Sequence, residues 1–410
     1  MEAPAPSRPL KILIVYETVY PDFIGGVEHR NFELGAGLAR RGHEVTLAGF
    51  CKPLPGIPPR LVVRSLGELG PLYNSAGQRS TRQAIRFAFT VPRIDVSEFD
   101  VVETANMPYI HIVPLAIKCR LAGKPLLVTW YEYWDHYWKG YVGRLKAPVY
   151  RAIEWMTGQL GTAVTATSLL TRERLAAKRW KGDVELVPCG IHVHAVREAA
   201  GVGTPRHGQG APLIFAGRML KEKRVDLLLR AVALLAKTRP GVLLTVFGDG
   251  PYRETLVRLA SELGIADRVD FRGHVETSAE VWRSLGLARV AVQPSEREGF
   301  GLFPLEAMAA GLPVVYCESP ESAVPELVRD GVEGVCTEPE PKALAVALER
   351  LLADGEEWQR LHENALKRAS GYDWDEVARR IEETCLRLLP RHREERVAEG
   401  GRVDHPADHP

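Results

Sequence analysis

Short β-branched runs alternate with longer stretches of helical periodicity along this chain, and the alternation occurs twice. In the first half, KILIVY from Lys11 precedes apolar residues at helical spacing between Val27 and Arg40, and EVTLAG follows from Glu44. The later runs are DVVE from Asp100, PLLVTW from Pro125, AVTAT from Ala163 and VELVP from Val184. Strands that alternate with helices form parallel sheets covered on both faces. The first half therefore predicts a doubly wound α/β domain.

A glycine- and proline-rich segment, AAGVGTPRHGQGAP at residues 199–212, separates the two halves and is typical of an interdomain linker. The alternation resumes with LIFAG from Leu213 and continues through LLTVFG, RVDF, VAVQP, PVVY and EGVC. The chain of 410 residues also exceeds what one hydrophobic core usually serves. We therefore expect two facing Rossmann-like domains, residues 8–198 and 213–371, with a cleft between them.

The last part of the chain predicts one more helix, at residues 372–390. Asp373 and Glu376 have the spacing of a capping box, and an apolar stripe at helical spacing runs from Val377 to Leu388. We expect this helix to pack back on the first domain. Residues 391–410 are charged, contain Pro, His and Gly, and have no such stripe, which predicts a disordered tail.

Charge and cysteine content narrow the choice of partners and compartment. With 53 basic and 52 acidic residues the chain has no net field to attract DNA, so nucleic acid is not an expected partner. Six cysteines lie far apart without a C-x-x-C pair, which indicates buried thiols, a reducing compartment and no structural zinc. The N-terminus lacks a secretory signal pattern, and prolines and charges interrupt the apolar stretch from Met107 to Val128. We expect a cytoplasmic protein without a membrane-spanning helix.

A glycine loop that leads into a short helix follows the run VAVQP. Gly299 and Gly301 permit backbone conformations closed to other residues, and Pro304 suits a first helical turn. A helix N-terminus offers free N–H groups and positive potential to a phosphate. Glu298 and Glu306 flank the loop as candidate acceptors for sugar or ribose hydroxyls. The alternative interpretation is that Glu306, third in the helix, only caps it and that Glu298 is solvated.

Two basic residues follow the run LIFAG, at the expected mouth of the cleft. Ligands of a doubly wound sheet bind beyond the carboxyl ends of its strands. Arg218 and Lys223 lie at such a strand end. A guanidinium fork and an ammonium charge can together neutralise a diphosphate leaving group. A solvated basic helix start is the alternative interpretation.

The segment EGFGLFPLE, from Glu298 to Glu306, resembles the E-x7-E signature of the retaining GT-B glycosyltransferases of family 4. Other pieces that resemble the family occur in its order, namely Gly25-Gly26, Arg218, Lys223, FGDGP from Phe247, FRGHV from Phe271 and the segment from Ala307 to Val315. Each piece is weakly specific alone, but their joint occurrence in order is highly specific. The resemblance covers almost the whole chain and implies a GT-B fold, with two facing Rossmann-like domains.

The resemblance also implies a role for each matched residue. Arg218 and Lys223 would bind the donor diphosphate and Glu298 the hydroxyls of the transferred sugar, so these three are the expected catalytic residues. Glu306 would bind the ribose hydroxyls. The implied donor-binding residues are Gly25, Gly26, Tyr131, Gly248, Gly250, His274, Gly299, Phe300, Gly301, Leu302, Phe303 and Glu306.

The resemblance implies retaining transfer of a hexosyl-type sugar from a UDP- or GDP-sugar to an acceptor hydroxyl. The acceptor would be a carbohydrate, a lipid-linked molecule or a small molecule, in glycan, glycolipid or glycosylated metabolite biosynthesis. Such enzymes generally work without a divalent metal, and the sequence has no D-x-D motif or carboxylate cluster with convincing ligand spacing. We expect no cofactor and no metal, with the nucleotide diphosphate sugar as co-substrate.

One segment departs from the family pattern. Related sequences often place a histidine that contacts the donor sugar after the strand corresponding to PLLVTW, whereas Tyr131 occupies that position here. A phenol can donate and accept a hydrogen bond, but its reach differs from that of imidazole. The aromatic run from Tyr131 to Tyr141 has three interpretations: core packing, acceptor stacking, or a weak peripheral membrane contact.

Three other functions were weighed against transfer. An NAD-dependent dehydrogenase would have G-x-G-x-x-G after its first strand, but this chain has ETVYPDFIGGVEH from Glu17. A nucleotide-sugar epimerase on the same scaffold stays open. A sugar-nucleotide-binding subunit without activity also stays open because of Tyr131, although Arg218, Lys223, Glu298 and Glu306 are all present.

Overall fold

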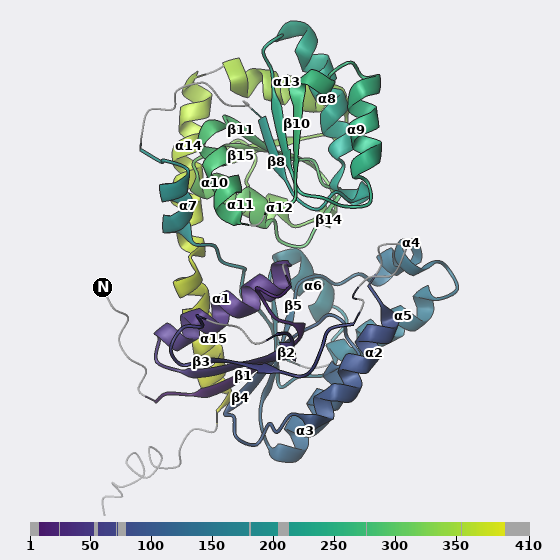
Figure 1. Ribbon diagram of the computed structural model, residues 1–410, viewed down its shortest axis with the longest axis vertical. Helices are drawn as coiled ribbons and strands as arrows, with labels where there is room; N and C mark the ends of the chain where they lie inside the picture. The colour runs from purple at the N-terminus through teal and green to yellow at the C-terminus, as the bar shows by residue number, and fades with distance from the viewer. Residues whose placement is uncertain are drawn as a thin grey trace, which may run out of the picture.

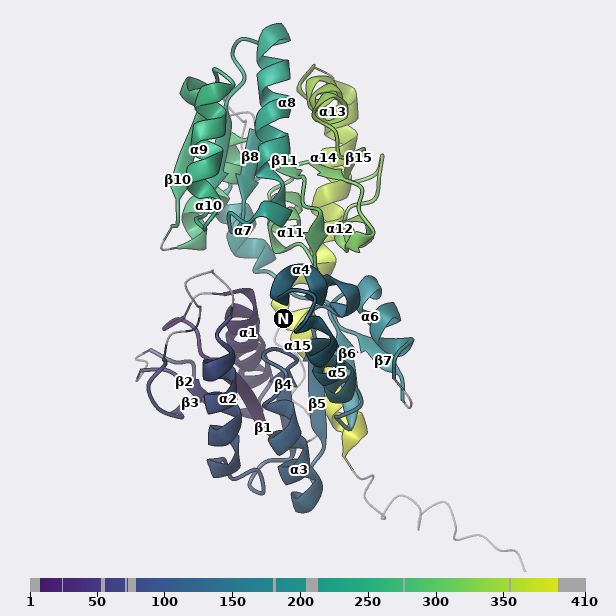
Figure 2. The ribbon, with the colours of Figure 1, turned by 90° about the vertical axis from the view of Figure 1, so that its right-hand side faces the viewer.

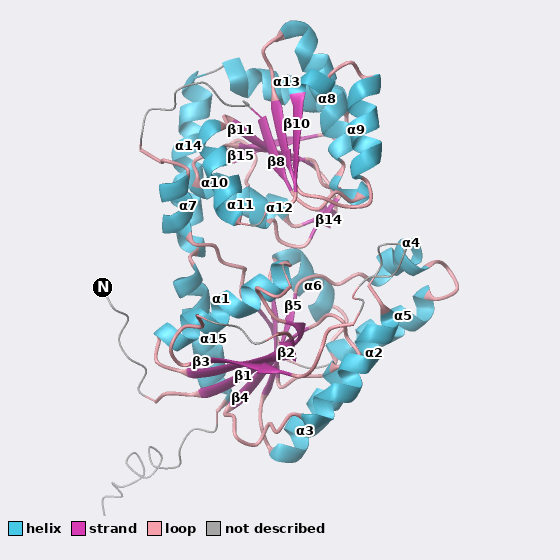
Figure 3. Ribbon diagram, in the orientation of Figure 1, coloured by secondary structure: helices cyan, strands magenta, loops and turns pink. Residues whose placement is uncertain are grey.

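The structure is a computed structural model, and it describes residues 8–23, 25–52, 56–70, 72, 79–179, 182–203, 213–275, 277–353 and 355–389. Within these residues the chain forms two sheets, one below and one above a central gap between ribbons in Figure 1. Every strand pair in both sheets is parallel. Helices lie on both faces of each sheet (Figure 3), and the predicted doubly wound α/β class is confirmed.

The first sheet has the strand order β3-β2-β1-β4-β5-β6-β7. Its strands are β1 (Lys11–Thr18), β2 (Glu44–Phe50), β3 (Leu61–Ser65), β4 (Val101–Ala105), β5 (Leu126–Trp130), β6 (Ala163–Ala166) and β7 (Val184–Leu186). Its helices are α1 (Gly26–Arg40), α2 (Thr81–Thr90), η1 (Val91–Arg93), α3 (Ile112–Ala122), η2 (Asp135–Tyr137), α4 (Trp138–Val142), α5 (Ala147–Gly158) and α6 (Leu169–Ala176). The helix α7 (Val193–Ala199) follows and packs on the second domain, against α10 and α11. The edge strand β3 is mostly exposed and was not predicted, because LVVRS carries a weaker apolar signal than the central runs.

The second sheet has the order β10-β9-β8-β11-β13-β15, and β12 pairs with β14 beside it. Its strands are β8 (Leu213–Ala216), β9 (Leu244–Phe247), β10 (Val269–Gly273), β11 (Val290–Gln293), β12 (Arg297–Glu298), β13 (Val314–Cys317), β14 (Glu321–Ser322) and β15 (Gly334–Thr337). The helices are η3 (Lys221–Lys223), α8 (Val225–Thr238), α9 (Arg253–Glu262), η4 (Ala266–Arg268), α10 (Ser278–Leu287), α11 (Leu302–Ala309), α12 (Val324–Leu327), α13 (Pro341–Ala353), α14 (Gly355–Ala369) and η5 (Ser370–Tyr372). The last helix in the chain is α15 (Trp374–Leu388).

The central strands are buried along their whole length because helices cover both of their faces. All residues of β4, β5, β11 and β13 are buried. This is why these runs are mostly apolar and do not alternate with exposed polar residues. The first-domain core includes Leu13, Val102 and Val128, and the second-domain core includes Phe215 and Val246.

The last helix, α15, belongs spatially to the first domain. It packs against α1 (Figure 1), and Trp374, Ile381 and Cys385 share a buried cluster with Ile12 and Leu34. At its start, a carboxylate oxygen of Asp373 accepts from the N–H of Asp375 at 3.1 Å. The carboxylate of Glu376 pairs with Arg379 and Arg380 one turn further on.

The chain passes between the domains twice, and the two crossings touch. The N–H of Ile191 donates to the carbonyl of Tyr372 at 2.9 Å, and the N–H of Trp374 donates to the carbonyl of Ile191 at 3.3 Å. Most of the predicted linker, residues 204–212, and the predicted tail, residues 391–410, lie outside the described residues. No helix of the described residues is long and apolar enough to cross a membrane.

Candidate functional site

Four strand ends meet at one edge of the second sheet, and the motif loops follow them. The strands β10, β9, β8 and β11 are neighbours, so their carboxyl ends lie side by side. The N–H of Gly248 donates to the carbonyl of Gly273 at 2.7 Å, and the N–H of Gly217 donates to the carbonyl of Phe247 at 3.1 Å. Segments that are up to 56 residues apart in sequence thus form one surface.

Gly248 is required by this close approach of loops. It has φ 114°, and a Cβ there would collide with the carbonyl oxygen of Gly217. A Cβ on Gly250 would lie 2.5 Å from the carbonyl oxygen of Met219. His274, from the third loop, is exposed beside them. The expected binding loops of this domain therefore share one edge, with Arg218 also exposed on it.

Lys223 and Glu298 form an ion pair at this edge. Lys223 Nζ lies 2.6 Å from Glu298 Oε2, and the two side chains are 18% and 17% exposed. The side-chain amide of Gln293 donates to the same carboxylate oxygen at 2.8 Å. The N–H of Ala323 donates to the Glu298 carbonyl at 2.8 Å and anchors the short strand β12. A ligand at this edge can therefore meet both a cation and a carboxylate.

Gln293 was missed by the sequence analysis. It is the last residue of β11 and is buried, while the other residues of that strand are apolar. A polar side chain at the end of a buried strand was the available signal, because such a side chain points to the edge where ligands bind.

The helix α11 begins at Leu302, with Gly301 before it at φ 102°. The sequence interpretation began this helix near Pro304 with Glu306 as its third residue, and that placement was wrong. Glu306 is the fifth residue, two residues beyond the position from which a glutamate can close a capping box. The free N–H groups of the first turn belong instead to the backbone around Leu302 and Phe303.

Glu306 points toward α10. Its Oε1 accepts a hydrogen bond from Trp282 Nε1 at 2.9 Å. Burial raises the pKa of Glu306 to about 7, and the Trp282 hydrogen bond opposes that rise. Trp282 was not predicted as a partner, because nothing in the local sequence links the two positions.

The N-terminus of α1 meets the N-terminus of α11 across the gap between the domains. A Cβ on Gly26 would lie 3.7 Å from Leu302 Cδ1, and Figure 1 shows α1 in the first domain facing α11 in the second. No side chain caps α1, because Gly25 occupies the N-cap position. Two helix N-termini with positive potential therefore converge where the glycine motifs were predicted to bind a diphosphate.

A contact between the domains lies next to Glu298. The guanidinium of Arg297 lies 4.2 Å from the ring centre of Trp134 and 4.0 Å from that of Tyr137, and it pairs with the carboxylate of Glu132. A Cβ on Gly299 would lie 2.6 Å from Glu132 Cγ, so only glycine fits there. Arg297 could not be predicted from the sequence, because its partners are more than 150 residues away in the chain.

The aromatic run from Tyr131 to Tyr141 packs mainly on itself. Tyr133 and Trp138 are buried, and the rings of Trp134 and Trp138 lie 4.5 Å apart. Of its three interpretations, core packing accounts for these side chains.

Tyr131 lies directly after β5, in the position where the family often has histidine. Its N–H donates to the side-chain oxygen of Asn106 at 3.2 Å, and Arg30 lies 5.7 Å from its ring centre. Its hydroxyl is buried and has no hydrogen-bond partner among the described residues. Burial raises the pKa of the phenol well above its usual value. The hydroxyl is therefore neutral. Phe300 lies across from Tyr372, with ring centres 6.2 Å apart.

Charged side chains on the first-domain side of the gap pair with one another inside the protein. Arg30 Nη1 lies 3.0 Å from Glu103 Oε1, and both side chains are 1% exposed. Arg79 donates to Glu17 at 2.7 Å. Burial raises the pKa of Glu17, and Arg79 opposes the rise. The sequence analysis found neither pair.

In the described residues, no group of three or more His, Cys, Asp or Glu side chains is arranged to hold a metal ion.

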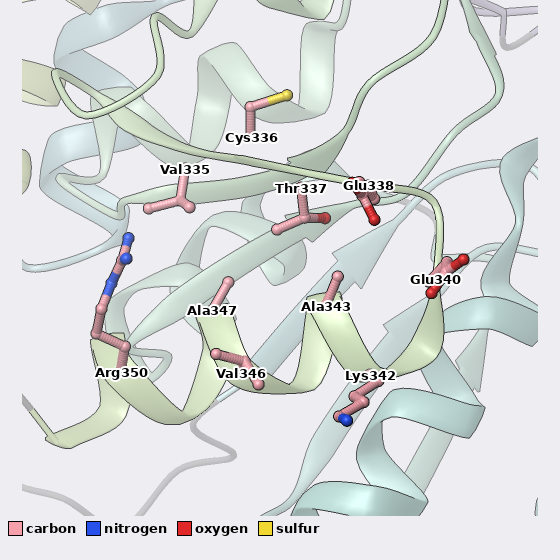
Figure 4. A pocket seen from close by; sticks show the side chains of 10 residues that line it. All are labelled: Val335, Cys336, Thr337, Glu338, Glu340, Lys342, Ala343, Val346, Ala347 and Arg350. Atoms are coloured by element: carbon pink, nitrogen blue, oxygen red, sulfur yellow. The ribbon is translucent and has the colours of Figure 1, made fainter.

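A hollow of about 450 Å³ lies apart from the candidate site, between β15 and α13, where Thr337, Lys342 and Arg350 line it (Figure 4). It lies on the outer edge of the second sheet, beside strand β15, and none of the motif residues line it.

Two family models match the chain, one on each half. The model described as Glycosyltransferase Family 4 matches residues 24–195, and the one described as Glycosyl transferases group 1 matches residues 204–368. A glycogen synthase of Mycobacterium tuberculosis is 32% identical over 238 residues, 58% of this chain and 56% of that protein. A D-inositol 3-phosphate glycosyltransferase of Streptomyces griseus is 36% identical over 234 residues, which are 54% of this chain and 48% of that protein. The chain spans about half the length of these curated relatives.

Solved structures resemble the chain over nearly its whole length. Anabaena HepE in complex with UDP and glucose superposes with a TM-score of 0.71 at 19% identity, covering 92% of this chain and 99% of that one. Sucrose-phosphate synthase from Thermosynechococcus elongatus gives 0.74 at 22% identity, with the same coverage. At these identities the likeness shows the fold, and the predicted GT-B architecture is confirmed.

Proposed function

The chain belongs to the family 4 glycosyltransferases, and we propose that it transfers a hexosyl sugar from a UDP- or GDP-sugar to an acceptor hydroxyl with retention of configuration. The observation that carries this proposal is the Lys223–Glu298 pair beside the converging N-termini of α1 and α11. That edge offers a cation, two helix N-termini and a carboxylate within one surface. A sugar diphosphate needs anion stabilisation at one end and hydroxyl acceptors at the other.

The proposed reaction divides the work among these groups. The bond between the anomeric carbon and the diphosphate oxygen breaks, and the acceptor oxygen bonds to the same face of that carbon. The acceptor proton passes to the departing diphosphate oxygen. Lys223 and Arg218 offset the charge that develops on the diphosphate, as do the N–H groups at the start of α11. When the donor binds, the Glu298 carboxylate leaves Lys223 and accepts hydrogen bonds from the sugar hydroxyls. The Glu306 carboxylate accepts hydrogen bonds from the ribose hydroxyls.

The proposed function also includes metal dependence, an acceptor class and a compartment. We propose that no divalent metal takes part, so that EDTA leaves the rate unchanged. The acceptor is a carbohydrate, a lipid-linked molecule or a small molecule that enters from the first domain. The six free cysteines, five of them buried, suit a reducing compartment such as the cytoplasm.

The test is release of nucleoside diphosphate from UDP-, GDP- and ADP-sugars, with and without mixed acceptors. Wild type is compared with Lys223→Ala and Glu298→Ala, and Lys342→Ala serves as a control because Lys342 is an exposed lysine beside the outer hollow. We expect release from one donor, lost in the first two variants and kept in the control. Conversion between sugars without acceptor would point to an epimerase. Binding without release would point to a subunit without activity, and failure to bind any donor would overturn the proposal.

A further inference from the structure

Exposed apolar side chains gather on one part of the first domain. Phe89, Leu121 and Leu145 are 76%, 83% and 96% exposed. The large exposed apolar side chains of this part come from α2, α3, α5 and the turn before α5, and they are Ile85, Phe89, Ile117, Leu121, Leu145, Val149, Trp155 and Met156. Large apolar side chains that gather on the exposed side of one domain favour interaction with a protein or a membrane.

The elements that carry these side chains lie on the same side of the molecule. Figure 2 faces this side and shows α2, α3, α4 and α5 together, and Figure 1 shows the same four helices at the right of the first domain. The hydroxyls of Thr81 and Tyr150 are 2.8 Å apart and join α2 to α5. Lys118 Nζ donates to the carbonyl of Pro92 at 2.8 Å and joins α3 to η1. We call this surface the α2–α5 face.

The exposed charges of the α2–α5 face are basic. Along α2, Arg82, Ile85, Arg86 and Phe89 are all exposed at helical spacing, so basic and apolar side chains share one stripe. The basic side chains within the four helices are Arg82, Arg86, Lys118, Arg120, Lys139 and Arg151, and of these Arg151 pairs with Asp135, which lies outside the helices.

Acidic side chains are nearly missing from the same helices. The four helices, all within the described residues, contain one acidic residue, Glu154. Glu154 is buried, where it accepts from Trp138 Nε1 at 3.0 Å. Because the whole chain has 53 basic and 52 acidic residues, this basic excess is local.

We infer that the α2–α5 face docks on an anionic lipid bilayer. Exposed apolar side chains enter the boundary between headgroups and acyl chains, while the arginines and lysines around them bind lipid phosphates. Neither set of side chains alone would specify a membrane. Apolar side chains interleaved with basic ones on helices that lack exposed carboxylates fit an anionic interface. The aromatic run from Tyr131 to Tyr141 is not the docking element, because its rings pack on one another.

The α2–α5 face begins at the gap between the domains. Tyr137, directly before α4, packs on Arg297, which precedes Glu298. A bilayer on this face would therefore place lipid headgroups next to the site. This part of the inference rests on the proposed function: the acceptor would be a sugar or alcohol on a membrane lipid that reaches the cleft from the α4 side.

The test is sedimentation of the full chain with vesicles of phosphatidylcholine, with and without phosphatidylglycerol, in the absence of nucleotide. We expect binding that requires phosphatidylglycerol and weakens with salt. Phe89→Glu with Leu145→Glu should reduce the bound fraction at least tenfold. The matched control is Leu287→Glu with Val346→Glu, which changes side chains that are 60% and 62% exposed in the second domain. Arg82→Gln with Arg86→Gln should weaken binding by about fivefold for each charge.

Three outcomes would overturn the inference. One is no sedimentation with either kind of vesicle, and another is an equal loss in the Leu287/Val346 control. The third is self-association in analytical ultracentrifugation that Phe89→Glu abolishes, because the face would then belong to a second copy of the chain. Vesicle binding and donor release are separate measurements. A chain that releases nucleoside diphosphate but ignores vesicles contradicts only the membrane inference, and the reverse result contradicts only the proposed function.

Discussion

Each domain places a carboxylate and a cation together near the gap, but the two pairs differ in exposure. Lys223 and Glu298 lie 2.6 Å apart and are 18% and 17% exposed. Arg30 and Glu103 lie 3.0 Å apart and are 1% exposed. An accessible pair can exchange its partner for a ligand, whereas a buried pair cannot separate without leaving a charge unpaired. The same chemistry therefore suits ligand binding in the second domain and supports the fold in the first.

The largest expected effect tests the buried pair. Glu103→Ala should lower the free energy of unfolding by about 3–5 kcal/mol, because Arg30 would remain buried without its carboxylate. Urea unfolding followed by circular dichroism measures the change. Glu298→Ala is the matched control and should cost less than about 1 kcal/mol, because Lys223 stays accessible to water. Equal losses in the two variants would erase the distinction between the pairs.

The accessible pair should instead control the rate. Lys223→Ala should reduce kcat for nucleoside diphosphate release by about 10²–10³-fold, the usual loss when one preorganised group at a developing negative charge is removed. Its unfolding free energy should stay within about 1 kcal/mol of wild type. A variant that unfolds early but turns over normally would show that Lys223 supports the fold instead.

A third prediction concerns pH and Glu306, whose pKa is raised to about 7 by burial. The carboxylate form, which accepts ribose hydroxyls, is populated above that pH and lost below it. The Kd of the bound nucleoside diphosphate should therefore rise about tenfold between pH 8 and pH 6. Isothermal titration at several pH values measures this. Glu306→Gln should bind weakly with a flat profile, and a sloping profile in that variant would assign the pH dependence to another group.

The raised pKa of Glu306 affects stability in the opposite pH direction from ligand binding. Because the folded state holds the Glu306 proton more tightly than the unfolded state does, the contribution of this group to stability is complete below the unfolded pKa, near 4.5. It is lost as pH rises through about 7. Thermal unfolding of wild type and Glu306→Gln over this range checks the sign.

The smallest expected effect concerns Tyr131 in the first domain. Tyr131→Phe removes a buried hydroxyl that has no partner among the described residues, so stability should be unchanged or slightly higher. If the hydroxyl contacts the donor sugar, kcat should fall about tenfold, a typical cost of one neutral hydrogen bond. Steady-state kinetics with the identified donor measures the rate. An unchanged rate would remove Tyr131 from the site and leave the second domain as the only one with tested donor contacts.

Local backbone structure could be predicted from the sequence. The glycine loop before α11 was predicted because glycines that permit unusual backbone angles and a following helix are visible in a few residues, and Gly301 has φ 102°. Gly248 was named only through the family resemblance, because the Gly217 carbonyl that excludes a Cβ there is 31 residues away in the sequence. The start of α11 was misplaced by two residues, since Gly301, not Phe303, takes the N-cap position.

Contacts between distant segments could not be predicted. Arg30 and Glu103 are 73 residues apart, and each is an ordinary surface residue type until the sheet brings them together. Arg297 gave no signal in the sequence either, because its contacts form only when the second domain meets the rings of Trp134 and Tyr137. Most of the first-domain side of the site consists of such contacts. These contacts therefore gave no signal in the sequence, whereas the roles proposed for second-domain residues follow from short local motifs.

The placement of α15 has a consequence for exchanging parts between related chains. Its side chains at Trp374, Ile381 and Cys385 complete a core whose other members come from the opposite end of the sequence. A recombinant gene spliced once between the two halves would join each first domain to a foreign final helix. Two junctions are needed, one near residue 192, before α7, and one near residue 372, so that the N-terminal segment and its closing helix are inherited together.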